Sequence, residues 1–318
     1  MFLFIAAVAS KIILNGEEKS FVQWMRTNNK IYTGNDYHLR LGIFITNTRW
    51  ASEYNRKGHS FTVGNNKFAT YTPSEFNSIL GLKPKALTVD RTSTKVTSRR
   101  KVAPESFDWR DRAVVNPIKD QAQCGSCWAF SAISAAESAY AIKNRNLLQF
   151  SEQNLVDCVT TSYGCSGGNP ETALLYVLAA QMGMFMSEDD YPYTGVDGGC
   201  LWNINKAIGS YSDITRINGG DEDDMANKIA TIGVASVCID AVKAFQAYTG
   251  GIYDDNDTCF SFFLNHAINC VGYGSENGTP YWIVRNSWGT DWGEEGYIRM
   301  LRGVDICGIS TSAFVSLP

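Results

Sequence analysis

A pair of cysteines near the middle of the chain is the first feature whose residue types and spacing could do chemistry. Residues 123–130, QCGSCWAF, place Cys124 and Cys127 three positions apart. Such a pair can be a redox couple, half of a zinc site, one arm of two disulfides, or a nucleophile beside a structural cysteine. The Ala-rich stretch 126–144 has apolar residues at helical spacing and predicts a helix with Ser126 as its N-cap. Cys127 would then lie in the first turn, where the helix dipole favours a thiolate.

Histidine scarcity limits these alternatives. The chain has three histidines, His38, His59 and His266, and no second C-x-x-C pair. A zinc site on Cys124 and Cys127 would therefore lack ligands, and the seven other cysteines disfavour a thioredoxin-type redox pair. His266 is the only imidazole after residue 59, and hence the base available to Cys127 at neutral pH. On these grounds alone, Cys127 is either a nucleophile or a buried structural cysteine.

Composition and length indicate a globular protein that enters the secretory pathway. The 318 residues are 44% hydrophobic and 19% charged, enough to bury the core of one large domain or two ordinary ones. Residues 1–10 are predicted to be a signal peptide, because MFLFIAAVA is apolar and ends in small residues; the alternative is an apolar start to a cytosolic chain. No later apolar run approaches the roughly 18 residues that span a membrane. All nine cysteines follow residue 123, and two N-glycosylation sequons, at Asn256 and Asn277, suit an exported protein.

Three separated blocks resemble those of the papain-like cysteine peptidases. They are SFDWRDRAVVNPIKDQAQCGSCWAF at 106–130, NHAINCVGYG at 265–274 and YWIVRNSWGTDWGEEGYIRM at 281–300. In the first block, CGSCW matches the signature of that family around its nucleophile. The resemblance implies that Cys127 is the nucleophile, that His266, 139 residues later, is the base, and that Asn286 orients the imidazole ring.

The same resemblance assigns roles to residues around this triad. Gln121, six residues before Cys127, matches the family's oxyanion-hole glutamine, whose amide would act with the Cys127 backbone N–H. Trp288 matches the indole that shields the bond between His266 and Asn286 from water. Spacing alone leaves the cysteine pairing open, whereas the resemblance implies the disulfides Cys124–Cys165, Cys158–Cys200 and Cys259–Cys307. Cys238 and Cys270 lie in apolar runs and are expected to be buried free thiols.

The resemblance also implies a substrate cleft. Gly167 and Gly168, in GCSGGN at 164–169, match the segment whose backbone pairs with an extended peptide, where another chain must approach closely. Asn265 and Trp288 are expected to contact substrate as well. The residues expected to line the pocket for the second residue before the scissile bond carry no charge, which favours an apolar partner; they are Asn169, Pro170, Cys238, Ala267 and Ser312.

The fold class expected is α+β. Residues around 125–185 read as helical, with periodic apolar positions at 152–159 and 170–183, whereas the part from about 207 onward reads as strands. The expected strands are 233–240, 267–274, 281–288 and 296–301, separated by Gly and Asn turns. By resemblance these halves are the two lobes of the papain fold, one helical and one like a β-barrel, preceded by a small helical prodomain.

The first hundred residues form a basic region without cysteine. Residues 1–102 contain 16 Lys and Arg against 6 Asp and Glu, whereas the remainder contains 12 against 26. Residues 36–55 resemble the interspersed helical motif of cathepsin L-like propeptides, at whose spacings stand Asp36, Arg40, Phe44, Asn47, Ala51 and Asn55. GNNKFAT, 64–70, resembles the next propeptide motif, but Thr70 stands where that motif has Asp. The alternative is an unrelated basic helical domain that binds acidic partners.

The sequence therefore predicts the zymogen of a cathepsin L-like cysteine endopeptidase. The domains expected are a signal peptide (1–10), an inhibitory propeptide (11–102) that ends in a cleavable linker at 83–103, and a peptidase domain (103–318). We expect a monomer without metal or cofactor in a secreted or lysosome/vacuole-type compartment. Its partners would be protein and peptide substrates, its own propeptide and cystatin-like inhibitors, but neither nucleic acid nor a membrane. A catalytically silent, peptide-binding homologue is the alternative.

Overall fold

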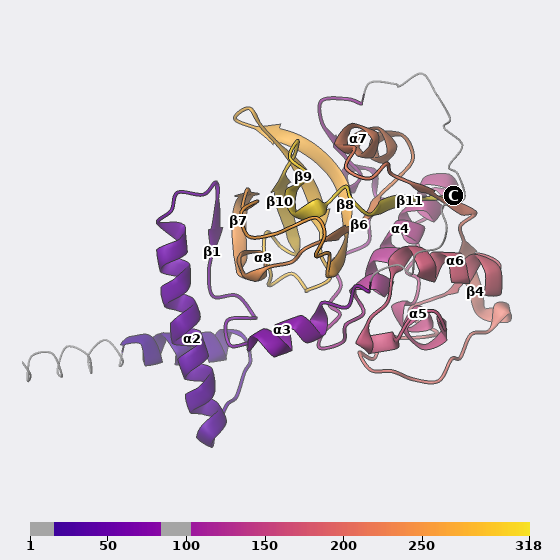
Figure 1. Ribbon diagram of the computed structural model, residues 1–318. Helices are drawn as coiled ribbons and strands as arrows, with labels where there is room; N and C mark the ends of the chain where they lie inside the picture. The colour runs from indigo at the N-terminus through magenta and orange to yellow at the C-terminus, as the bar shows by residue number, and fades with distance from the viewer. Residues whose placement is uncertain (1–15, 84–102) are drawn as a thin grey trace, which may run out of the picture.

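The computed structural model describes residues 16–83 and 103–318 (Figure 1). The predicted signal peptide and nearly all of the predicted linker lie outside the described residues. Among the residues described, no helix is long and apolar enough to cross a membrane. The expected α+β fold is present, with a helical N-terminal region, a helix-rich lobe and a sheet lobe (Figure 1).

The N-terminal region is built around crossed helices. Residues 16–27 are helical, and they are followed by α2 (Gly34–Asn55), β1 (Phe61–Val63) and α3 (Pro73–Ile79). A small core of this region contains Phe21, Trp24, Phe44 and Ala69. Thr72 and Glu75 form a capping box that fixes the start of α3. The Glu75 carboxylate also binds Arg40 of α2 at 2.6 Å, so one ion pair ties the two helices together.

The helix-rich lobe surrounds a long buried helix. Its elements are α4 (Cys127–Asn144), α5 (Glu152–Cys158), α6 (Pro170–Ala180), β3 (Met184–Met186), β4 (Ala207–Ser210), η2 (Gly164–Ser166) and η3 (Ile204–Lys206). The short helix η1 (Arg110–Arg112) precedes them in the chain and contacts the sheet lobe, where Arg110 lies over the Tyr297 ring. The three helices predicted for this part of the sequence are confirmed. Thirteen of the first fifteen residues of α4 are small or apolar and all are buried, because α5, α6 and the sheet pack around them.

The second lobe is one mixed sheet. Its strands are β2 (Phe107–Asp108), β5 (Asp213–Arg216), β6 (Ala235–Ile239), β7 (Tyr248–Tyr253), β8 (His266–Glu276), β9 (Thr279–Arg285), β10 (Tyr297–Leu301) and β11 (Ala313–Leu317). They lie in the order β1-β7-β10-β9-β8-β6-β11-β5, with β2 against β8, and the four predicted strands are all present. The lobe also holds α7 (Glu222–Thr231), α8 (Lys243–Gln246) and η4 (Ile306–Gly308). Strand β1 of the N-terminal region thus extends a sheet that belongs to the rest of the chain.

Three disulfides close loops in the second part of the chain. They are Cys124–Cys165, Cys158–Cys200 and Cys259–Cys307, the pairs that the resemblance implies. The partners lie 41, 42 and 48 residues apart, and loops of this size are each worth roughly 4 kcal/mol in the chain-entropy estimate. The described cysteines outside these bonds are Cys127, Cys238 and Cys270, all buried.

Candidate active site

Cys127 is the first residue of α4 and lies at the junction of the two lobes. Its thiol is completely buried and packs with Leu82, Cys238 and Ala267. Burial raises the pKa of Cys127 to about 11, although hydrogen bonds from the backbone of Ala267 and Gly81 offset part of this shift. The cysteine is therefore a neutral thiol while residues 79–83 cover it.

Ser126 occupies the N-cap position that the sequence predicts, but its side chain does not cap the helix. Its backbone dihedrals, φ −99° and ψ 15°, are those of neither an extended cap nor a helix, and no amide of the first turn donates to its hydroxyl. The hydroxyl instead lies 2.7 Å from the Tyr193 hydroxyl. The prediction that the Ser126 side chain caps α4 is therefore wrong, because no backbone N–H of the first turn binds its hydroxyl.

His266 is the first residue of β8, and one of its ring nitrogens is bound to Asn286. Its Nε2 lies 2.9 Å from Asn286 Oδ1. That oxygen also accepts the backbone N–H of Ser287 at 2.8 Å, so it can act only as an acceptor toward the ring. Nε2 therefore carries the proton, and Nδ1, which has no hydrogen-bond partner among the described residues, offers its lone pair. Burial lowers the pKa of His266 to about 4, with the bond to Asn286 acting in the opposite direction.

Trp288 covers this histidine. Its ring stacks on the imidazole with a centroid distance of 4.6 Å and an angle of 24° between the planes. Phe245 and Trp292 pack around it, and both indoles are almost fully buried. The bond between His266 and Asn286 is therefore in a dry environment, where a hydrogen bond is stronger than in water.

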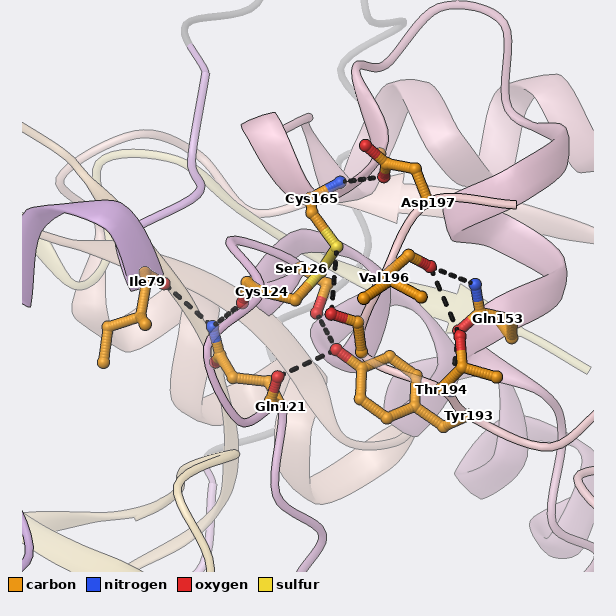
Figure 2. Close-up of a disulfide and its surroundings, with 12 residues drawn as sticks. Ile79, Gln121, Cys124, Ser126, Gln153, Cys165, Tyr193, Thr194, Val196 and Asp197 are labelled. Carbon is orange, nitrogen blue, oxygen red and sulfur yellow. Dashed lines mark hydrogen bonds between the residues drawn. A yellow bond between two sulfur atoms is a disulfide. The ribbon is translucent and has the colours of Figure 1, made fainter. Parts of the chain in front are cut away.

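Gln121 is held by hydrogen bonds at every polar atom, and Figure 2 shows those to Ile79, Cys124 and Tyr193. Its Oε1 accepts from the Ser287 hydroxyl at 2.7 Å, and its backbone N–H donates to the Ser287 carbonyl at 2.9 Å. One hydrogen of Nε2 binds the Cys124 carbonyl at 2.9 Å. The other binds the Ile79 carbonyl of the N-terminal region at 2.8 Å, so that hydrogen becomes free if residue 79 leaves.

Residues 79–83 occupy the cleft between the lobes. The Gly168 N–H donates to the Gly81 carbonyl at 2.8 Å, and the Lys83 N–H donates to the Gly168 carbonyl at 2.7 Å. On the other side, the Leu82 N–H donates to the Asn265 carbonyl at 3.1 Å. The pairing of Leu82 with Gly168 is parallel. A Cβ on Gly81 would lie 1.6 Å from the Gly125 carbonyl oxygen, so only glycine at position 81 lets the segment lie this close to the Gly125 backbone.

The Leu82 side chain fills an apolar pocket. Cys238 and Ala267, two of the expected pocket residues, contact it, and Leu264 packs beside them. Leu264 was absent from the expected set, although it lies only two residues before His266 and could have been considered for that reason.

Three of the other expected cleft residues, Gly167, Asn169 and Ser312, contact residues 81–83 or a residue of this pocket. Asn169 caps α6 through its Oδ1 and donates from its Nδ2 to the Lys83 carbonyl at 3.3 Å; Pro170 is the first residue of that helix. The Ser312 carbonyl accepts the Cys238 N–H at 3.1 Å. Gly167, with φ +114°, approaches the Gly81 carbonyl closely. Trp288 contacts a different part of the N-terminal region, since its ring meets Phe68 and Phe76 at centroid distances of 5.0 and 5.6 Å.

Comparison with known protein families agrees with both parts of the chain. Residues 103–317 match the papain family of cysteine proteases, and residues 21–76 match the cathepsin propeptide inhibitor domain. The chain is 37% identical to a cathepsin L-like proteinase of Fasciola hepatica, with 100% of this chain and 98% of the relative covered. It is 36% identical to pro-cathepsin H of Mus musculus, with 97% and 93% covered.

Solved structures of precursors match the whole arrangement. Digestive procathepsin L2 proteinase from the Tenebrio molitor larval midgut superposes with a TM-score of 0.85 at 36% identity, covering 95% of this chain and 100% of that one. A recombinant stem bromelain precursor superposes with a TM-score of 0.83 at 34% identity, covering 95% and 99%. With a peptidase domain and a propeptide inhibitor domain in one polypeptide, the chain belongs to the papain family of cysteine proteases and is a zymogen of that family.

Proposed function

We propose that this zymogen yields an endopeptidase in which Cys127 is the nucleophile, His266 the general base and Asn286 the group that orients the imidazole. Gln121 and the backbone N–H of Cys127 would stabilise the oxyanion. The scissile carbonyl of a substrate would take the place beside Gln121 that the Ile79 carbonyl occupies, and the substrate backbone would pair with Gly168 and Asn265.

One observation carries this proposal. The Nε2–H of Gln121 that points into the cleft already binds a carbonyl oxygen, that of Ile79, beside a cysteine whose thiol the same segment covers. A peptide carbonyl from residues 79–83 therefore stands in for the carbonyl of a substrate. Donors that bind a carbonyl in this way bind a developing oxyanion more strongly, which is how they accelerate acyl transfer.

The chemistry follows from the proton positions. When residues 79–83 leave, water enters the cleft, the desolvation that keeps Cys127 neutral weakens, and His266 Nδ1 takes the thiol proton. The thiolate attacks the peptide carbonyl, and the negative charge that forms on its oxygen binds Gln121 and the Cys127 N–H. The imidazolium then protonates the leaving amine, which departs from an acyl-enzyme. Water, deprotonated by His266, hydrolyses the acyl-enzyme and restores the thiol.

The substrates we propose are extended peptides with an apolar residue in the pocket that Leu82 fills, because the apolar cluster around Leu82 consists of Cys127, Cys238, Ala267 and Leu264. The three disulfides support a secreted or lysosome/vacuole-type compartment, where such bonds persist. We further propose that the processed enzyme acts as a monomer that cystatin-like inhibitors can block.

Substitution of the nucleophile tests the proposal. Cys127→Ala should leave the fold and disulfides intact but abolish hydrolysis of peptide substrates, a loss of about 10⁴-fold or more by analogy with other nucleophile removals. Cys270→Ala, which removes a free thiol outside the cleft, is the matched control and should retain activity. Hydrolysis by pure Cys127→Ala protein would refute the assignment, and an inactive processed wild-type enzyme would favour the silent homologue.

A further inference from the structure

The turn from Gln121 to Cys124 is strained and must be held from outside. Ala122 has φ +54°, a left-handed conformation that a non-glycine residue adopts at a cost of about 1 kcal/mol or more. Its N–H donates to Asp120 Oδ1 at 2.9 Å, and the Cys124 N–H reaches the Gln121 carbonyl only at 3.3 Å. The turn therefore depends on neighbouring groups to keep Gln121 in place.

Tyr193 is one of those groups, and it comes from a loop far along the chain. Its hydroxyl lies 2.9 Å from the Gln121 backbone carbonyl and 2.7 Å from the Ser126 hydroxyl (Figure 2). Its ring packs edge-on against Phe130 at 4.9 Å, and its N–H donates to Glu188 Oε1 at 2.8 Å. The hydroxyl is thus held in a fixed position between the Gln121 turn and the start of α4.

The proton directions in this chain of bonds follow from counting donors. A tyrosine hydroxyl has one hydrogen, and the Gln121 carbonyl can only accept, so that hydrogen points to Gln121. The Ser126 hydroxyl must then donate to Tyr193. Burial raises the pKa of Tyr193 well above its ordinary value, so the hydroxyl remains a donor at every pH at which such an enzyme works.

We infer that Tyr193 is a positioning residue for the oxyanion site. Its hydroxyl joins the backbone of Gln121 to Ser126, the residue before Cys127, and these two segments supply the two proposed oxyanion donors. Holding their separation constant keeps the Gln121 amide at hydrogen-bond distance from the oxygen that becomes negative in the transition state. The inference rests on the proposed function, and it gives the Ser126 hydroxyl, which does not cap α4, a role.

Removal of this hydroxyl is the first test. In the processed enzyme, Tyr193→Phe keeps the ring against Phe130 and should lower kcat about tenfold while KM changes less than twofold, because the loss concerns the transition state. Tyr191→Phe is the matched control. Tyr191 belongs to the same loop, but its hydroxyl binds Asp157 at 2.7 Å, away from the Gln121 turn. Tyr191→Phe should leave kcat within twofold; equal kcat losses in both variants would overturn the inference.

Alkylation separates positioning from general damage. Iodoacetamide reacts with Cys127 by displacement at a saturated carbon, and no oxyanion forms in that reaction. Its rate constant in Tyr193→Phe should therefore stay within twofold of wild type although peptide hydrolysis falls. A parallel fall in both rates would mean that Tyr193 supports the thiolate or the fold instead, and would overturn the inference.

A double-mutant cycle with Gln121 completes the test. Gln121→Ala should lower kcat about 100-fold, the usual effect of losing one oxyanion donor. Adding Tyr193→Phe to that background should cost less than a further twofold, since the amide it positions is gone. Fully multiplicative losses would overturn the inference without touching the proposed function. Full activity of Gln121→Ala would instead refute the oxyanion assignment on which the inference rests.

Discussion

The N-terminal region, 16–83, and the peptidase part, 103–318, are stabilised in different ways. The first 123 residues contain no cysteine, and the core that the N-terminal region forms by itself centres on Phe21, Trp24 and Phe44. Most of its other buried apolar residues pack into the core of the sheet lobe. The peptidase part has three disulfides and large cores of its own. We therefore expect the fold of the N-terminal region to be stable only in contact with the peptidase part, whereas the peptidase part should remain folded after the N-terminal region is removed.

Aromatic packing and hydrogen bonds join the two regions, with few ion pairs among the described contacts. Phe68 and Phe76 pack against Trp288, and Phe61 lies 4.6 Å from Tyr253 between ring centroids. The described contacts also include the ion pair Lys67–Asp120 at 2.5 Å and a hydrogen bond of 3.3 Å between His59 Nδ1 and Asp254 Oδ1. Although the two regions have opposite net charges, few oppositely charged side chains are therefore in contact between them.

The largest expected effect is on the binding of the N-terminal region to the peptidase part, when Gly81 is substituted. In a separately made propeptide, Gly81→Ala should weaken inhibition of the processed enzyme about 100-fold or more, because its Cβ would overlap the Gly125 backbone. Gly42→Ala is the matched control, since nothing lies within 4 Å of the added atom on α2. Inhibition constants check both variants; similar values for the two would show that residues 79–83 do not hold the propeptide in the cleft.

A smaller effect is expected from Asn286, which acts only in the peptidase part. Asn286→Ala should lower kcat about 20-fold with little change in KM, because the imidazole loses its orienting acceptor but the thiol and base remain. Steady-state kinetics on one peptide substrate are sufficient. An increase in KM at unchanged kcat would make Asn286 a substrate contact and contradict the triad.

Salt should affect the association of the two regions only slightly. The charge difference alone predicts strong attraction between them, but the apolar contacts predict that inhibition by the propeptide at pH 7 weakens less than about threefold between 0.05 and 0.5 M salt. The Arg40–Glu75 pair should not limit this binding on acidification, because Arg40 lowers the pKa of Glu75 to about 2. A salt effect above about 30-fold would restore long-range charge as the main attraction.

The smallest expected effect is the pH dependence of the folding stability that the buried Glu152 contributes. Burial raises the pKa of Glu152 to about 8, with Glu137 adding to the shift and Lys119 opposing it. The folded state therefore holds a proton that the unfolded state releases near 4.5, so this contribution to stability is full below that pH and is lost as pH rises through about 8.

In a Cys127→Ala background, the Tm should be higher at pH 5 than at pH 8. Glu152→Gln should reduce that difference by about 3 °C or more. Glu105→Gln, at an exposed position, serves as its control and should leave the difference unchanged. If Glu152→Gln behaves like Glu105→Gln, the buried carboxylate is already ionised by its bond to Lys119.

Features that depend on a local sequence pattern could be predicted from the sequence. Helix α4 and strands β8 and β9 lie where the sequence predicts them, with Cys127 and His266 as the first residues of α4 and β8 and Asn286 directly after β9. The hydrogen bond between Ser126 and Tyr193 could not be predicted, because the two residues are 67 positions apart in the sequence and this bond replaces the local helix cap. Leu264 in the pocket and the pairing of β1 with β7 likewise depend on tertiary contacts, which no periodicity encodes.

Labelling of the free thiols tests the central claim most directly. A peptidyl epoxide that alkylates cysteine should react with the processed enzyme at one equivalent, on Cys127 alone among Cys127, Cys238 and Cys270. Hydrolysis should disappear in proportion to the label, and the uncleaved precursor should remain unlabelled because residues 79–83 cover the thiol. Label on Cys238 or Cys270, or hydrolysis that survives complete labelling of Cys127, would contradict the account.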